Sequence, residues 1–111
     1  MAYDEDLANR VRELLAGEDA ITEMAMFGGL AFLLAGNMAV AVSSNGGLMV
    51  RLGPDGEEQA LTDPHAQPVE MGKRRMRGWV RVAEEGLRTR RQLSPWVRRG
   101  AQFARSLPPR G

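Results

Sequence analysis

The chain contains no cysteine among its 111 residues. Disulfides, thiolate metal sites and cysteine nucleophiles are therefore excluded, and the composition agrees with a reducing compartment. Histidine occurs once, so His65 lacks the partners of an ordinary transition-metal site and is expected in an exposed loop, Asp63-Pro64-His65. Copper ligation by Met24, Met26 and Met38 is conceivable, but packing is the preferred interpretation. We predict no metal and no cofactor.

Long hydrophobic runs are also missing. No segment approaches the roughly 20 apolar residues that span a membrane. The first 14 residues are acidic and amphipathic, whereas a signal peptide begins basic and continues apolar. We therefore expect a cytoplasmic protein without membrane contact. Only three Phe, two Trp and one Tyr are present, so aliphatic residues and methionine must form the core of the single domain predicted for residues 1–111.

The residues of a catalytic site are absent from the sequence pattern. No serine or threonine has a nucleophile-elbow context, and His65 is the only histidine that could act as its base. Gly28-Gly29 lacks the Lys and Ser/Thr of a phosphate loop, so it is interpreted as a turn or bulge. The acids of residues 4–6 suit the start of a helix, and Glu57-Glu58 suits a solvated face. We predict a protein that is not an enzyme and has no small-molecule substrate.

What the sequence does contain is a series of short apolar segments between Ile21 and Gly53, separated by residues that tolerate positive φ. Such spacing predicts antiparallel strands joined by hairpin turns, with Asn45-Gly46 as the stronger turn signal. The first strand is predicted over Ile21–Phe27, ended by Gly28-Gly29. The strand that follows Asn45-Gly46, Leu48–Leu52, alternates apolar and polar residues and should lie nearer an edge of the sheet.

The middle hairpin of this region has no polar face. A two-residue turn at Gly36-Asn37 would pair Leu34 with Ala39 and Phe32 with Ala41. One side of the hairpin would then carry Leu33, Met38, Val40 and Val42. The opposite side would carry Leu30, Phe32 and Leu34. An antiparallel hairpin with one solvated face should instead alternate apolar and polar residues. Either helices cover both faces, or one face is buried against a second copy.

The remaining elements are predicted from periodicity and capping residues. Apolar residues at helical spacing predict a helix over Asp4–Ala16, with Asp4 as N-cap, and a last helix with Ser94-Pro95 at its start. Thr89 and Gln92 form a capping box that can add one preceding turn. Between them lie a short helix and two strands, about Glu57–Leu61, Pro68–Met71 and Met76–Val82. The predicted fold is α+β, a single antiparallel sheet of about five strands in the order α-βββ-α-ββ-α, with helices packed on it.

Charge is unevenly distributed along the chain. Residues 1–70 hold 3 Lys/Arg and 12 Asp/Glu, a balance of −9, while residues 71–111 hold 12 and 2, a balance of +10. The basic segment could contact a polyanion, form a solvated face or match the acidic part of the chain. Arginine beside an aromatic residue can contact phosphates and stack on bases. The candidate contact residues for nucleic acid or a partner are Lys73, Arg74, Arg75, Arg77, Trp79, Arg90 and Arg91.

Several segments resemble the N-terminal domain of the TfoX/Sxy competence regulators. The most specific is Met26–Leu33, MFGGLAFL, followed by Gly36-Asn37-Met38. Weaker matches are the opening YDEDLANRVRELL, Met76-Arg77-Gly78-Trp79-Val80, Trp96-Val97 and Ser106-Leu107-Pro108-Pro109. The resemblance covers nearly the whole chain and implies an α/β domain with helices around an antiparallel sheet. It also implies a bacterial, stand-alone domain without the second, helical domain of the competence regulators.

The resemblance implies a role in transcription, because the competence regulators act with a cyclic-AMP-dependent activator on DNA-uptake genes. Two hypotheses follow for this chain. The first is a non-enzymatic interaction and regulatory module, a transcriptional co-regulator that contacts a protein partner or a second copy of itself. The alternative is a direct nucleic-acid-binding protein that uses the basic C-terminal segment.

Overall fold

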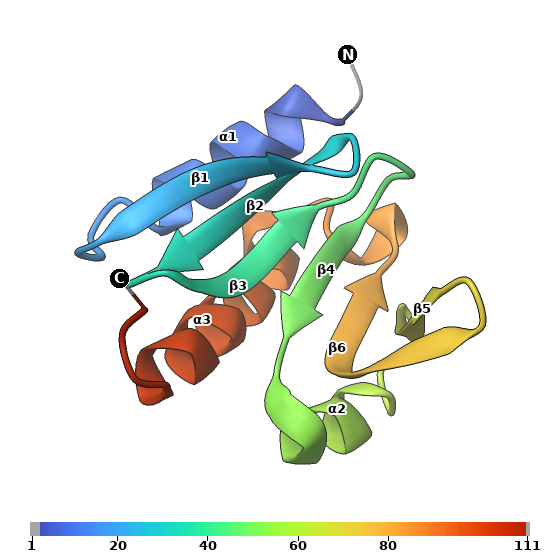
Figure 1. Ribbon diagram of the computed structural model, residues 1–111. Coiled ribbons are helices and arrows are strands. Elements are labelled where there is room, and N and C mark those ends of the chain that lie inside the picture. Colours follow the sequence, from blue (N-terminus) through green and yellow to red (C-terminus); the bar gives the residue numbers. More distant parts are fainter. Residues whose placement is uncertain (1–2, 111) are drawn as a thin grey trace.

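The computed structural model describes residues 3–110, with Met71 described by its backbone alone; residues 1, 2 and 111 of the predicted 1–111 domain lie outside the described part. Within these described residues, three α-helices and six antiparallel strands follow one another (Figure 1). Their bounds are α1 Glu5–Leu14, β1 Ile21–Met26, β2 Gly29–Leu34, β3 Asn37–Val42, β4 Leu48–Arg51, α2 Gly53–Ala60, β5 Ala66–Met71, β6 Arg74–Val82 and α3 Arg90–Ser106, with a 3₁₀ turn at Glu84–Gly86. The predicted α+β class is confirmed, with six strands rather than about five, because the segment between α1 and α2 forms four strands.

The strands form a single sheet in the order β1-β2-β3-β4-β6-β5. β4 was expected near an edge but lies between β3 and β6, so that interpretation is wrong. Apolar and polar residues alternate along β4 because its two faces have different surroundings. Leu48 and Val50 enter the core, whereas Met49 and Arg51 remain partly exposed on the opposite face. The edge strands are β1 and β5.

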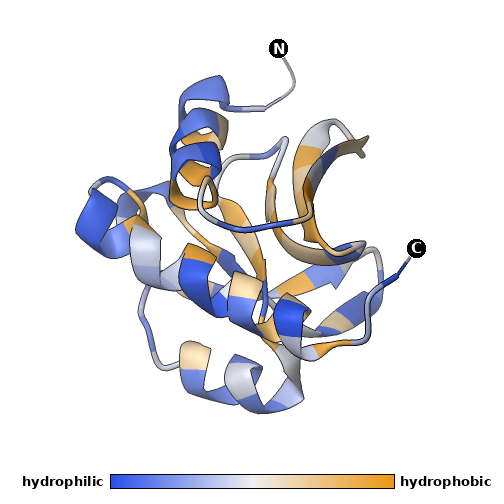
Figure 2. Cartoon of the chain, turned by 90° about the vertical axis from the view of Figure 1, so that its left-hand side faces the viewer, coloured by the Kyte–Doolittle hydropathy of each residue, from blue (hydrophilic) through white to orange (hydrophobic). Residues whose placement is uncertain are grey.

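Helices α1 and α3 pack on one face of the sheet and bury the main core against it (Figure 1). The central strands β2 and β3 are largely hydrophobic, whereas the helices mix hydrophobic and hydrophilic residues (Figure 2). Core residues of the helices include Val11 of α1 and Leu93 and Val97 of α3, which pack with Phe32 and Val40 of the sheet. None of the helices in residues 3–110 combines the length and the apolar character needed to cross a membrane.

The two long helices begin at capped residues. The Asp4 carboxylate accepts hydrogen bonds from the backbone N–H groups of Asp6 and Leu7, as predicted for the first helix. The last helix begins at Arg90 with Thr89 as its N-cap, and the capping box with Gln92 is complete. The prediction that Ser94-Pro95 opens this helix is therefore wrong; Pro95 lies inside it, because the capping box starts the helix one turn earlier.

Both tight hairpin turns lie one residue earlier than the sequence predicted. The β1–β2 turn consists of Phe27 and Gly28, with φ of 49° and 79°, and the β2–β3 turn consists of Ala35 and Gly36, with φ of 51° and 83°. Positive φ at both central residues is the signature of a type I′ turn, in which glycine takes the second place. Phe27 is therefore not part of β1, and Asn37 begins β3 rather than forming the turn.

The shift changes which residues share a face. Phe32 pairs with Val40 rather than with Ala41, and Leu33 pairs with Met38 across a bulge. Val40 and Val42 consequently lie with the helices in the main core, on the face opposite to the one predicted for them. The Asn45-Gly46 signal correctly marks the β3–β4 hairpin, but the connection is five residues long, from Ser43 to Gly47.

Helix α2 joins β4 to β5 and is held to β6 by a buried carboxylate. It begins at Gly53 with Pro54 in its first turn, four residues before the predicted start. Glu57 accepts a hydrogen bond from the Gly78 N–H at 2.8 Å and pairs with Arg75 at 2.7 Å. Its side chain is 8% exposed, so the prediction of a solvated face is wrong for Glu57 and correct only for the exposed Glu58.

Gly100 lets α3 approach β3 closely. A Cβ atom at this position would lie 2.6 Å from the Ala39 carbonyl oxygen. In an isolated helix Gly→Ala is stabilising by about 1 kcal/mol. In this protein we expect Gly100→Ala to lower the free energy of unfolding by about 1–3 kcal/mol, because the helix must move away from the sheet. Urea unfolding measures the sign, and an unchanged or higher stability would contradict this packing.

Candidate interaction site on the uncovered sheet face

The face of the sheet opposite α1 and α3 carries no helix in residues 3–110. The sequence predicted that both faces are covered, by helices or by a second copy of the protein. Coverage of both faces by helices is therefore wrong, whereas burial against a second copy is not tested by a single chain. Ala31, Leu33 and Ala41 form a second apolar cluster there, with Met26 and Met38 packed against it. Met49 completes this cluster, and none of its members belongs to a helix. We call this surface the uncovered face.

A line of paired residues crosses the uncovered face from strand to strand. In antiparallel ladders directly opposite residues point to the same side. The pairing registers join Met24, Ala31, Ala41, Met49 and Arg81, from β1 through β6. The centre of this line consists of alanines and its ends of long side chains, so the surface is hollowed. The hollow has a volume of about 410 Å³ and is lined mainly by apolar atoms.

Phe27 lies at one end of this hollow and is 81% exposed. Its φ of 49° is in the left-handed region, which is a marked outlier for a bulky residue. Folding does not account for this choice, because an Asn or Asp at the first position of a type I′ turn would avoid both the exposure and much of the backbone strain. Strain and exposure retained together are typical of functional surfaces.

The charged residues that line the hollow are all cationic. Arg51, Arg81 and Arg110 contribute to it, with the Arg51 guanidinium lying 5.5 Å from the centroid of the Phe103 ring of α3, and no Asp or Glu among the described residues does. Arg110 is held nearby because its N–H donates to the Ala35 carbonyl at 2.7 Å. The Asn37 side chain, only 3% exposed, donates to the Pro108 carbonyl at 2.9 Å and fixes the same segment. The uncovered face therefore combines an apolar floor with a positive rim.

The basic residues predicted as contacts do not form one patch. Lys73, Arg74, Arg75 and Arg77 lie together and exposed on the β5–β6 hairpin. The ion pair between Arg75 and Glu57 joins the basic segment to the acidic part of the chain. A second such ion pair joins Arg105 to Glu18 on the other side of the molecule.

The other three predicted contact residues are separated from the hairpin cluster. Trp79 is only 7% exposed and lines the hollow, so its indole is not a free stacking platform. Arg90 begins α3 beside Arg10 and Glu13 of α1. Arg91 lines a different depression, which contains His65. The predicted set is thus divided among four places.

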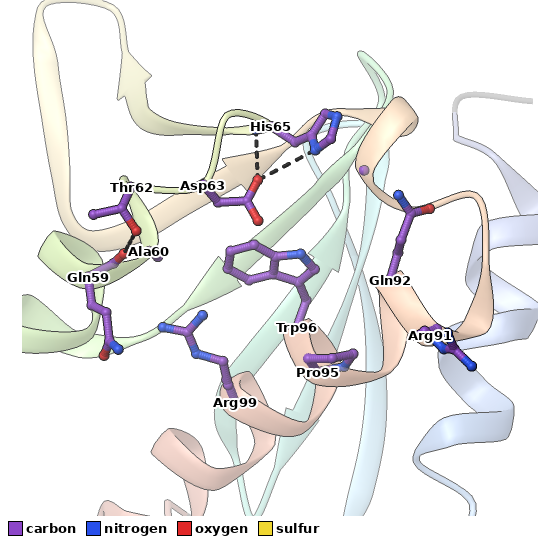
Figure 3. A pocket seen from close by; sticks show the side chains of 11 residues that line it. Gln59, Ala60, Thr62, Asp63, His65, Arg91, Gln92, Pro95, Trp96 and Arg99 are labelled. Carbon is purple, nitrogen blue, oxygen red and sulfur yellow. Dashed lines mark hydrogen bonds and ion pairs between the residues drawn. The ribbon is translucent and has the colours of Figure 1, made fainter.

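The depression around His65 is a polar notch of about 390 Å³ between α3 and the loop that precedes β5 (Figure 3). Asp63 accepts a hydrogen bond from the His65 backbone N–H at 2.8 Å, and its carboxylate lies 3.4 Å from His65 Nδ1. Arg99 lies over the Trp96 ring, 5.1 Å from its centroid. The Thr62 hydroxyl is bonded to the Gln59 carbonyl, so it does not face His65 (Figure 3).

Among the residues that line this notch, Asp63 and His65 are the ones with a carboxylate or an imidazole side chain. Within residues 3–110, no group of three or more His, Asp or Glu side chains is arranged to hold a metal ion. His65 lies in a loop, as the sequence predicted, but it is only partly exposed.

Sequence reasoning missed the most informative residues of the uncovered face. The sequence correctly assigned Met24, Met49 and Arg81 to strands. Because the turns were placed one residue too late, it did not show which residues lie beside them on the same face of the sheet. Phe27 was placed in β1, although the Phe-Gly pair between two apolar runs was a usable turn signal once glycine is allowed the second turn position.

Among the comparisons with known proteins, the comparison with protein families found a match. The family model described as the TfoX N-terminal domain matches residues 13–104, which include every strand and most of α3. No curated protein and no solved structure matches the chain significantly. The family match covers most of the chain, and the chain therefore belongs to the family of TfoX N-terminal domains.

Proposed function

We propose that this chain is a non-enzymatic interaction module of the cytoplasm, which binds a protein partner or a second copy of itself through the uncovered face. Its family relation to TfoX supports a regulatory role of the competence-regulator type. Transcriptional co-regulation is the form of that role that we propose. The observation that carries the proposal is the apolar hollow bordered by Phe27, a residue that is 81% exposed and lies on strained backbone.

Met24→Glu should disrupt binding without unfolding the protein. Met24 is 49% exposed on the uncovered face, so a charge there disturbs the surface more than the core. We expect the variant to lose at least about tenfold in affinity, as substitutions at anchor residues do. Affinity capture from the native cytoplasm and light scattering after size exclusion measure the partner and the self-association, respectively.

The matched control is Ala25→Glu. Ala25 is the next residue of β1, also exposed, and pairs with Leu30 on the helix-bearing side. Capture and oligomeric state that respond equally to both substitutions, or to neither, would contradict the proposal.

A second candidate function is direct nucleic-acid binding through the β5–β6 hairpin. The observation in its favour is the exposed cluster of Lys73, Arg74 and Arg77. If it is correct, affinity for DNA or RNA must fall steeply with salt and must fall further in Arg74→Glu. Absence of binding to DNA and RNA at low salt would end this alternative.

A further inference from the structure

We propose that the occupant of the uncovered face is an acidic amphipathic helix of another protein. This inference rests on the proposed function and specifies the charge and the secondary structure of the partner segment. Apolar side chains of such a helix would enter the hollow over Ala31 and Ala41, while its carboxylates would pair with the arginines of the rim. Helices that bind in grooves use anchors at positions i, i+3, i+4 and i+7 on one side.

Charge at the rim distinguishes an acidic partner from a second copy. The residues that line the hollow include Arg51, Arg81 and Arg110 and no carboxylate. In a two-fold dimer through this face, two positive rims would approach each other across an apolar interface. Like charges brought together at an interface repel each other and oppose association. An acidic segment removes that cost and replaces it with charge-assisted hydrogen bonds.

The floor and walls of the hollow favour a protein segment over nucleic acid. The walls include Met26, Met38 and Met49, and the floor consists of alanines. Methionine is flexible and polarisable, so surfaces rich in it adapt to the apolar side of amphipathic helices. Nucleic-acid bases, in contrast, bind by stacking in succession on several exposed aromatic rings, whereas Trp79 in this hollow is only 7% exposed and Phe27 is the single exposed ring among its lining residues.

The size of the site agrees with this occupant. About 410 Å³ lies within the range of roughly 300–1,000 Å³ found for ligand sites and accommodates a few apolar side chains. Phe27 extends the apolar surface beyond one end of the hollow. A single turn of helix could seat its anchor residues in the hollow and contact Phe27 with the next turn.

The experiment uses the full chain and two synthetic peptides of about five helical turns. Both carry leucine at the anchor positions; one has glutamate and the other lysine on the flanking positions. Fluorescence anisotropy at low salt gives the affinities for the wild type, Arg81→Glu and Arg110→Glu. Arg74→Glu is the matched control, because Arg74 is exposed on the hairpin outside the hollow. Circular dichroism checks that each variant is folded.

We expect the glutamate peptide to bind the wild type at least tenfold more tightly than the lysine peptide. Arg81→Glu and Arg110→Glu should each weaken the glutamate peptide several-fold and strengthen the lysine peptide, while Arg74→Glu changes neither by more than twofold. Equal binding of the two peptides, absence of binding by both, or equal effects of the three variants would overturn the inference. Displacement of the glutamate peptide by a DNA duplex, dependent on the same arginines, would also overturn it and assign the face to nucleic acid.

Failure of this inference is distinguishable from failure of the proposed function. If both peptides fail while capture of a natural partner still depends on Met24, the uncovered face binds a partner of other chemistry. If capture does not depend on Met24, the proposed function itself fails.

Discussion

Replacing Phe27 by asparagine is expected to make the protein more stable and its partner binding weaker. The free energy of unfolding should rise by about 1 kcal/mol, because asparagine relieves much of the left-handed backbone penalty of roughly 1–2 kcal/mol. The substitution also places asparagine directly before Gly28, and Asn-Gly is the preferred pair of a type I′ turn. Little packing is lost, since Phe27 is 81% exposed. Partner affinity should fall at least about tenfold if the ring is an interface anchor.

Urea unfolding and the capture assay measure these opposite effects on the same protein. Ala35→Gly is the matched control, since Ala35 is the first residue of the other type I′ turn, at the opposite end of β2. It relieves backbone strain as well but keeps Phe27, so binding should stay unchanged. A destabilised Phe27→Asn variant would show that the ring serves the fold, and a variant that binds like the wild type would show that the ring is not an interface anchor.

Replacing Glu57 by glutamine is expected to remove about 1–3 kcal/mol of stability at neutral pH. The charged carboxylate accepts from the Gly78 N–H and from Arg75 while almost buried, and hydrogen bonds to charged groups are worth about 1.5–3 kcal/mol. Glutamine can keep one of these two bonds but loses the ion pair. Since this carboxylate joins α2 to β6, its loss should loosen that helix first, which hydrogen exchange of α2 amides can detect.

The same contacts make stability dependent on pH. The hydrogen bond from the Gly78 N–H, together with Arg75, lowers the pKa of Glu57 in the folded protein. When pH falls below the ordinary glutamate pKa of about 4.3, Glu57 becomes protonated in the unfolded chain, whereas the same carboxylate stays charged in the folded protein. The contribution of Glu57 is therefore complete above that pH and is lost as pH falls through the lowered pKa.

Comparison of variants isolates this contribution. The pKa of Glu23 is also lowered, by its hydrogen bond with Arg12, so the wild type alone would report both carboxylates. The difference in unfolding free energy between wild type and Glu57→Gln removes the Glu23 part and should shrink as pH falls below about 4. Glu58→Gln, at the exposed neighbouring position, should have little effect at any pH. A difference that stays constant with pH would contradict a charged Glu57 in the folded state.

Much of the fold could be predicted from local signals in the sequence. Capping residues such as Asp4 and Thr89 and the helical spacing around Leu93 and Val97 correctly indicated the long helices. The hairpins were also found, but glycine was taken as the first residue of each turn, whereas Phe27 and Ala35 occupy that place. Because side chains alternate along a strand, this error of one residue exchanged the faces of β3.

The surroundings of a strand or helix were harder to predict than its type. β4 alternates like an edge strand although it is internal, because one face of the whole sheet is left without helices in residues 3–110. Glu57 gave no sequence signal of burial, since its partners Gly78 and Arg75 lie about twenty residues further along the chain. The uncovered face joins residues of five strands, so only the pairing registers reveal it.

Methyl NMR of the methionine-labelled protein tests the central claim most directly. Met24, Met26, Met38 and Met49 lie on the uncovered face and report on it without any substitution. On titration with the partner recovered by capture, the account predicts shifts or broadening of these four methyl signals at the concentration at which binding occurs. A partner that binds and leaves all four signals unchanged would contradict the account, since the binding surface would then lie elsewhere on the molecule.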